Sequence, residues 1–269
     1  GRSLSRALDD VPSQLSDDRA LIQEMCYGSL REYHRLSRIV ASLLKKPLKD
    51  KDADVQALLL LGVYQLLYMR VPDHAAVSET VSATAVLKKP WARGLLNGVL
   101  RNVQRQREDV RDKAEATEEG RWSHPQWLVD AIRAAWPEDW QSLLEANNQR
   151  PPMSLRVNTA KIGAADYVAK LKEAGIAARS SELTPCTLGL EQAQDVHTLP
   201  GFEEGLVSVQ DEAAQQAALL MDLQPGQRVL DVCEVRVGET KAAGRLVRNS
   251  WAGTIAGIAH AGAPSESVG

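Results

Sequence analysis

The apolar residues of the first 120 positions recur at helical intervals, and this periodicity constrains the fold more than any other feature. Stripes of leucine, isoleucine and valine run through residues 21–44, 55–69 and 94–107. Residues 55–69 are apolar almost all round, which is typical of the central helix of a bundle. This segment is too short for a membrane span and contains Gln56 and Gln65. The sequence therefore predicts an all-helical domain over residues 1–120.

The pattern changes after Pro151 and Pro152. Residues 153–158 alternate as a strand, residues 164–174 have a helical pattern that ends at Gly175, and residues 187–190 and 206–210 are short strand candidates. Asp211 is a good N-cap for a helix that follows, and residues 229–233 form an apolar strand pattern. Alternating elements of this kind predict a small α/β domain over residues 150–222 and the start of a further domain over residues 223–269.

The segment between these two patterns is polar. Residues 108–120 are charged and almost free of large apolar side chains, which is typical of a solvated helix end or a linker. Residues 121–149 then contain two short amphipathic helices, and we interpret them as a helical linker. His124 is expected to fix the turn of this linker, with Trp127 as its apolar anchor.

Composition limits the classes of function. The net charge is −3, so bulk charge does not indicate a nucleic-acid partner. The three cysteines, Cys26, Cys186 and Cys233, have no metal-ligand spacing and are odd in number, which favours a reducing compartment and no metal site. The sequence has no secretory leader pattern and no membrane span, so we expect a soluble cytoplasmic protein.

Basic residues are distributed unevenly. The first basic segment, residues 31–51, has seven Lys and Arg against Glu32 and Asp50, and the second basic segment, residues 80–107, has six against no acid. The candidate phosphate contacts are Arg35, Arg38, Lys45, Lys46, Lys88, Lys89, Arg93, Arg101 and Arg105. The alternative interpretation of each segment is an ordinary solvated helix face.

Several motifs occur in an order that resembles a known family. The segments LGVYQLLYMRVPDHAAVSETV (61–81) and GLLNGVLRN (94–102) are similar to the helical RNA-binding domain of the antitermination factor NusB. The segments SHPQW (123–127), NNQRPPMSLRVN (147–158) and LPGFEEGLVSVQDEAAQ (199–215) resemble the Fmu/Sun family of ribosomal RNA methyltransferases. The resemblance implies a NusB-like bundle, a small α/β domain like an RNA-recognition module, and the truncated start of a Rossmann-like methyltransferase domain.

The same resemblance implies a reaction and a cofactor. The family methylates carbon 5 of a cytosine in small-subunit ribosomal RNA with S-adenosylmethionine. The family's cofactor loop corresponds to LDVCEVRVGET (230–240) in this sequence. This segment retains Asp231, Cys233 and Gly238 of the loop but lacks the family's Ala-Ala-Pro-Gly run. Similarity ends after about residue 233, through either a frameshift or real divergence, so we expect this fragment neither to bind the cofactor nor to be active.

No catalytic residue is predicted. The reaction needs a cysteine thiolate, which the resemblance places downstream of the cofactor loop. Cys26 lies on the apolar side of a helix, Cys186 has no partner base in the sequence, and Cys233 corresponds to the cofactor motif. Arg150 and Arg156 contact either RNA or a catalytic domain. Three functions therefore remain open: an incomplete rRNA methyltransferase, a non-catalytic module that binds RNA or a ribonucleoprotein, or a helical docking surface for transcription or ribosome proteins.

Overall fold

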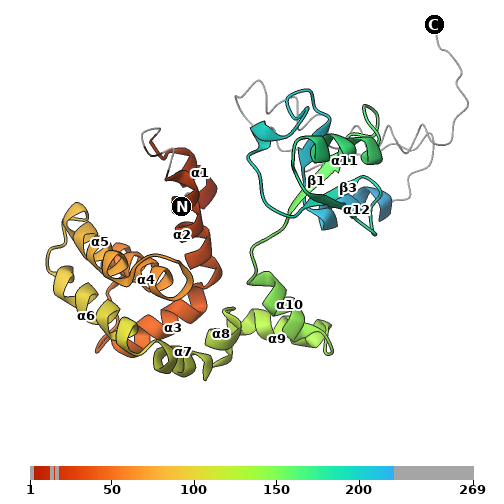
Figure 1. Cartoon of the computed structure of the whole chain (residues 1–269). Coiled ribbons are helices and arrows are strands. Elements are labelled where there is room, and N and C mark those ends of the chain that lie inside the picture. Colours follow the sequence, from red (N-terminus) through yellow and green to blue (C-terminus); the bar gives the residue numbers. More distant parts are fainter. Residues whose placement is uncertain (1–2, 13–14, 16–17, 221–269) are drawn as a thin grey trace, which may run out of the picture. The chain divides into compact units, whose positions relative to one another are not determined.

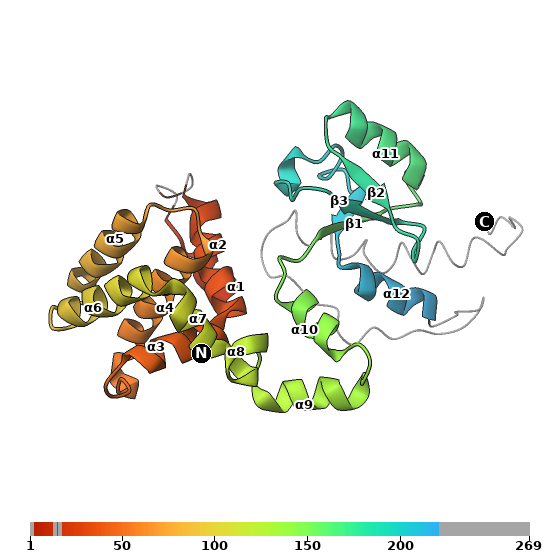
Figure 2. The ribbon, with the colours of Figure 1, turned by 60° about the horizontal axis from the view of Figure 1, so that its bottom comes forward.

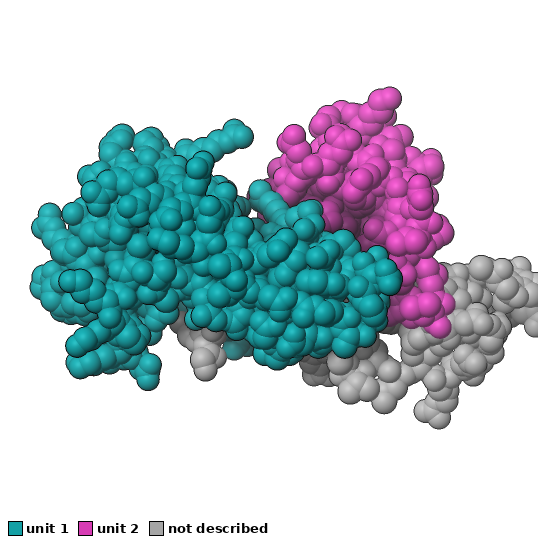
Figure 3. All heavy atoms as spheres, turned by 90° about the horizontal axis from the view of Figure 1, so that it is seen from below, with its two compact units in different colours: residues 1–150 teal, residues 151–269 magenta. Residues whose placement is uncertain are grey.

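The computed structural model describes residues 3–12, 15 and 18–220 (Figure 1). It divides the chain into two compact units, residues 1–150 and residues 151–269, which Figure 3 distinguishes by colour. The strand predicted at residues 229–233 and the start of a Rossmann-like domain lie outside the described residues.

The described part of unit 1 is helical, as its periodicity predicts. Its elements are α1 (Leu4–Asp9), α2 (Arg19–Arg31), α3 (Tyr33–Leu43), the 3₁₀ helix η2 (Asp50–Asp52), α4 (Ala53–Tyr68), α5 (Asp73–Val86), α6 (Ala92–Arg105), α7 (Arg107–Glu115), α8 (Glu118–Trp122), α9 (Gln126–Ala135) and α10 (Trp140–Asn147). Helix α4 lies inside the bundle and contacts α2, α3, α5 and α6, which confirms the prediction of a central helix (Figures 1 and 2).

Helices α4 and α6 approach closely in the core. Leu59 and Leu100 are completely buried. A Cβ atom added at Gly62 would lie 2.8 Å from a methyl group of Leu100 and 2.9 Å from one of Thr80, so glycine allows α5 and α6 to contact α4. Burial of each leucine side chain stabilises the fold by roughly 2 kcal/mol, because its apolar surface is removed from water.

The charged segment that follows α6 is structured. Most of residues 108–120, which the sequence indicates as a solvated helix end or linker, lie in α7 and α8. Val110 and Ala114 are buried in the bundle core, and α7 contacts α3. Two small apolar residues four positions apart are enough to bury one face of a nine-residue helix whose other positions are polar.

The expected role of Trp127 is wrong. Its side chain is 70% exposed, whereas Trp122 is buried. Trp122 packs with Val129 and Leu144 and meets the Trp140 ring edge-to-face at a centroid distance of 5.1 Å. The apolar anchor of this segment is therefore Trp122, because it stands on the side of α8 that faces α9 and α10.

Unit 2 contains a four-stranded antiparallel sheet. Its described elements are β1 (Met153–Val157), α11 (Ala164–Glu173), β2 (Ala178–Ser180), β3 (Thr187–Leu190), the 3₁₀ helix η3 (Val196–Thr198), β4 (Val207–Val209) and α12 (Glu212–Leu220), with strand order β2-β3-β1-β4. Leu155 pairs with Leu188 on one side and Val209 on the other. Helix α11 ends before Gly175, whose φ of +74° suits glycine, as its position in the sequence predicts.

The bundle core generates a first prediction. Replacing Leu100 with alanine leaves a cavity between α4 and α6 and should lower the free energy of unfolding by about 2–5 kcal/mol, measured by urea denaturation. Val86, which is 82% exposed, provides the control. The Val86→Ala variant should unfold within about 0.5 kcal/mol of the parent. Equal stability of the two variants would contradict the placement of Leu100 in the core.

Candidate nucleic-acid interface

The predicted phosphate contacts have different surroundings in the structure. Some of these basic side chains hold the bundle together, and the others are exposed. The distinction matters because a cation already paired inside the fold cannot also neutralise a phosphate without breaking its own contacts.

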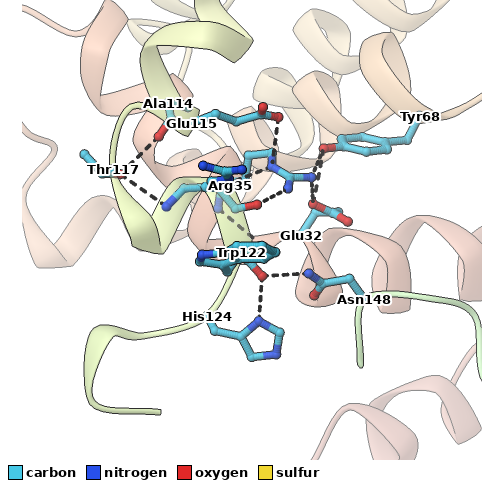
Figure 4. Close-up of polar contacts among 12 residues, drawn as sticks. Glu32, Arg35, Tyr68, Ala114, Glu115, Thr117, Trp122, His124 and Asn148 are labelled. Atoms are coloured by element: carbon cyan, nitrogen blue, oxygen red, sulfur yellow. Dashed lines mark hydrogen bonds and ion pairs between the residues drawn. The ribbon is translucent and has the colours of Figure 1, made fainter. Parts of the chain in front are cut away.

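Arg35 belongs to the first group. Its guanidinium donates to Glu32 Oε2 at 2.9 Å, to the Tyr68 hydroxyl at 3.2 Å and to the Gly120 carbonyl at 2.9 Å, and it forms an ion pair with Glu115 at 3.6 Å (Figure 4). The side chain of Arg35 is only 17% exposed. Burial, and then the neighbouring Glu32 carboxylate, raise the pKa of Tyr68. Arg35 therefore joins α3 to α4 and α8 rather than facing a ligand.

The turn that follows α8, beside Arg35, is held by hydrogen bonds to one backbone carbonyl. The Trp122 carbonyl accepts hydrogen bonds from His124 Nδ1 at 2.6 Å and from Asn148 Nδ2 at 2.6 Å (Figure 4). Ser123 has a left-handed φ of +53°, and its hydroxyl donates to the Arg31 carbonyl at 3.2 Å. His124 thus fixes the turn after α8, which agrees with its expected role.

Lys89 joins the two basic segments. Its ammonium donates to the Lys51 carbonyl at 2.9 Å, to Asp52 Oδ1 at 2.9 Å and to Asp54 Oδ1 at 2.6 Å. The hydrogen bond from Lys89 lowers the pKa of Asp54. These contacts place the loop between α5 and α6 beside the loop between α3 and α4, at one end of the bundle. The two basic segments therefore meet in space at Lys51 and Lys89, which are 38 positions apart in sequence.

Exposed cations surround this junction. We define the basic loop surface as Lys45, Lys46, Lys49, Lys51, Lys88 and Arg93, all of which are exposed. None of these six side chains has a hydrogen bond or ion pair to another described residue. Lys89 forms ion pairs with Asp52 and Asp54. Asp50 is the third carboxylate in the described loops 44–54 and 87–91, and it has no ion pair there. The surface is consequently strongly positive in a chain of negative net charge.

The remaining candidates lie along helices. Arg38 forms an ion pair with Glu119, and Arg101 donates to Gln104 at 3.0 Å. Arg105 donates to the Arg101 carbonyl at 3.2 Å. All three arginines are exposed. Sequence reasoning did not identify Lys49 and Lys51 as separate contacts, although both belong to the first basic segment.

Unit 2 holds a different kind of cation. Arg156 on β1 is 9% exposed, and its Nη1 donates to Gln210 Oε1 at 3.4 Å. Burial lowers the pKa of Arg156. Asp211 Oδ1 accepts from the Ala213 amide at 2.9 Å, which confirms its N-cap role. Arg156 is therefore enclosed by its own unit, in contrast to the exposed Arg150.

Neither the cysteines nor the cofactor loop forms a reaction centre within the described residues. Burial raises the pKa of Cys26, which keeps it in the thiol form. The Cys186 thiol lies 3.9 Å from Gln215 Oε1, a neutral amide oxygen that is a poor base. Asp231, Cys233 and Gly238 lie outside the described residues. Within residues 3–12, 15 and 18–220, no cluster of His, Cys, Asp and Glu could hold a metal ion, and no helix there is long and apolar enough to cross a membrane.

Comparison with known proteins identifies both units. Residues 1–105 match the NusB family, and residues 124–197 match the Methyltr_RsmF/B-like, ferredoxin-like domain. The ribosomal RNA small subunit methyltransferase B of Pseudomonas putida is 50% identical over 238 residues, which are 88% of this chain and 54% of the relative. The protein of the same name from Proteus mirabilis is 44% identical over 241 residues, 89% of this chain and 57% of the relative.

A solved structure has a similar fold. The crystal structure of PH0851 superposes with a TM-score of 0.65 at 19% sequence identity, over 90% of this chain and 54% of that one. The matches define a class of methyltransferase in which a NusB-like helical domain precedes a ferredoxin-like domain. The chain belongs to the family of ribosomal RNA small subunit methyltransferase B. It spans about half the length of the curated relatives it matches.

The contacts of Arg35 generate a second prediction. The Arg35→Ala variant leaves the Glu32 carboxylate, in a residue 7% exposed, without its cation, and should lower the free energy of unfolding by about 3 kcal/mol or more. Arg38, whose side chain is 48% exposed, is the matched control, and Arg38→Ala should cost less than about 1 kcal/mol. Chemical denaturation measures both. If the two variants lose similar stability, Arg35 does not hold the bundle together.

Proposed function

We propose that unit 1 binds ribosomal RNA through the basic loop surface. The observation that carries the proposal is the Lys89 contact, because it brings two basic segments together and occupies the nearby carboxylates, which leaves six exposed cations. Phosphates of an RNA backbone are the ligand class that such a surface attracts, and the contacts would weaken with salt as counterions are released. The names of the relatives support ribosomal RNA as the nucleic acid.

We further infer that the whole protein methylates carbon 5 of a cytosine in small-subunit ribosomal RNA with S-adenosylmethionine, in the cytoplasm. The supporting observation is the family to which the chain belongs. In that reaction unit 1 would hold the RNA, and the target base would have to leave its stack to reach a catalytic pocket. The described residues provide no catalytic group, so no chemical step is assigned to them.

The sequence of this chain does not fit the cofactor. A cofactor loop between the first strand and helix of a methyltransferase domain needs glycines, because the backbone must approach the ligand closely. Glu234, Val235, Arg236 and Val237 stand in that loop instead. This chain is therefore proposed to act as an RNA-binding module without methyl transfer of its own.

The RNA proposal predicts a specific salt dependence. A variant with Lys45, Lys46 and Lys88 all changed to Glu should bind small-subunit RNA about tenfold or more weakly, and its slope of log affinity against log salt should fall by about 1 for each phosphate that is no longer neutralised. Fluorescence anisotropy over a salt titration measures both quantities. A control variant changes the exposed Lys170, Lys172 and Arg179 of unit 2 to Glu, which alters the net charge equally. If both variants bind with equally reduced affinity, only bulk charge matters and the basic loop surface is not the binding site.

The cofactor proposal has its own test. Titration calorimetry of the chain with S-adenosylmethionine should give no saturable heat, and a tritiated-methyl transfer assay on unmodified small-subunit RNA should give no incorporation. The variant in which residues 234–237 are replaced by Ala-Ala-Pro-Gly is the matched comparison. Saturable binding by the unaltered chain would refute the proposed absence of a working cofactor site.

A further inference from the structure

Trp91 is an exposed aromatic residue that lies between Lys88 and Arg93 of the basic loop surface in the sequence. It follows Pro90 in the loop between α5 and α6, and its side chain is 54% exposed. Contact between an apolar indole ring and water is unfavourable in free energy. Exposed aromatic rings among cations are a common feature of surfaces that bind single-stranded nucleic acids. Neither the bundle core nor the Arg35 contacts use this ring.

The backbone that carries Trp91 is held firmly. The Lys89 amide donates to the Thr84 carbonyl at 3.0 Å, the Ala92 amide to the Lys89 carbonyl at 3.0 Å, and the Arg93 amide to the Pro90 carbonyl at 3.2 Å. The Lys89 side chain also ties this loop to the start of α4. The backbone at Trp91 is therefore ordered before a ligand binds, which lowers the conformational cost of binding.

The adjoining face of α6 leaves space next to the ring. Positions 94, 98, 101 and 105 follow position 91 at intervals of three and four, so they share one face of the helix. A Cβ atom added at Gly94 or Gly98 would meet no atom within 4 Å. Beyond this open stretch, Arg101 and Arg105 are exposed on the same face. A strand lying along α6 would therefore meet an aromatic ring at one end and two guanidinium groups at the other.

We propose that this face of α6 holds an unpaired segment of RNA, with one base stacked on the indole of Trp91. The proposal rests on the proposed RNA-binding function and specifies which form of RNA the surface prefers. Paired bases in a duplex are hidden within the stack, so a flat aromatic side chain can reach only an unpaired base. Lys88 and Arg93 are the exposed cations nearest to Trp91 in sequence, and in this proposal they contact phosphates of the bound strand.

Affinity measurements with three RNA probes test this inference on the full chain. The probes are a single strand of about 12 nucleotides, a duplex of the same length, and an abasic single strand with the same phosphates. The Trp91→Ala variant should bind the single strand about 5- to 100-fold more weakly and should be unchanged toward the abasic strand and the duplex. Trp91→Phe should retain most of the affinity, whereas Trp91→Leu, which keeps apolar bulk without a π face, should behave like the alanine variant.

Trp127→Ala is the matched control, because this tryptophan is 70% exposed on α9 outside the basic loop surface. It should bind all three probes as the parent does. Unchanged single-strand binding by Trp91→Ala, or equal weakening with the abasic strand, overturns the stacking. If charge reversal at Lys45, Lys46 and Lys88 then still weakens binding, the proposed function stands without it. A parent chain that binds none of the three RNAs overturns both.

Discussion

The Lys89 ammonium is the group on which the arrangement of the basic surface depends. Its hydrogen bonds to Lys51, Asp52 and Asp54 tie the α5–α6 loop to the start of α4. Lys89 offsets one of the two carboxylate charges that it contacts, and the six exposed cations of the basic loop surface outnumber the negative charges that remain in the described loops. Each loop is also anchored in the bundle core, through Leu44 and Leu48 in one and Ala92 directly after the other, and the hydrogen bonds of Lys89 link the two loops to each other.

Charge in unit 1 therefore has two roles that residue type alone does not distinguish. Arg35 and Lys89 are each surrounded by acceptors from other elements and stabilise the fold, whereas Lys45, Lys88 and Arg93 face solvent. The sequence shows the excess of basic residues in both segments, because that excess is local. It does not show which cations are paired, because the acceptors lie far along the chain: the Gly120 carbonyl is 85 positions from Arg35.

The same division between local and distant information applies to the fold. Periodicity was sufficient to predict the helices of the bundle and the strands β1, β3 and β4, because their apolar residues repeat regularly. It missed α7, whose buried face consists of Val110 and Ala114 within a charged segment, and it missed β2, a three-residue strand with two exposed positions. The sequence predicts Trp127 as the anchor of the linker turn, whereas Trp122 has that role, because it depends on which side of a short helix meets α9 and α10, and that is a tertiary property. The exposure of Trp91 is likewise a tertiary property, because the sequence does not show that its ring lies outside the bundle core.

The helical bundle of unit 1 therefore presents the basic loop surface and the exposed indole of Trp91 at one end. Ultraviolet cross-linking of the full chain to small-subunit RNA, followed by mass spectrometry of the cross-linked peptides, tests this claim most directly. Cross-links should concentrate in peptides that cover residues 44–54 and 87–105. Cross-links confined to residues 151–220, with none in those two segments, would contradict RNA binding by the helical unit.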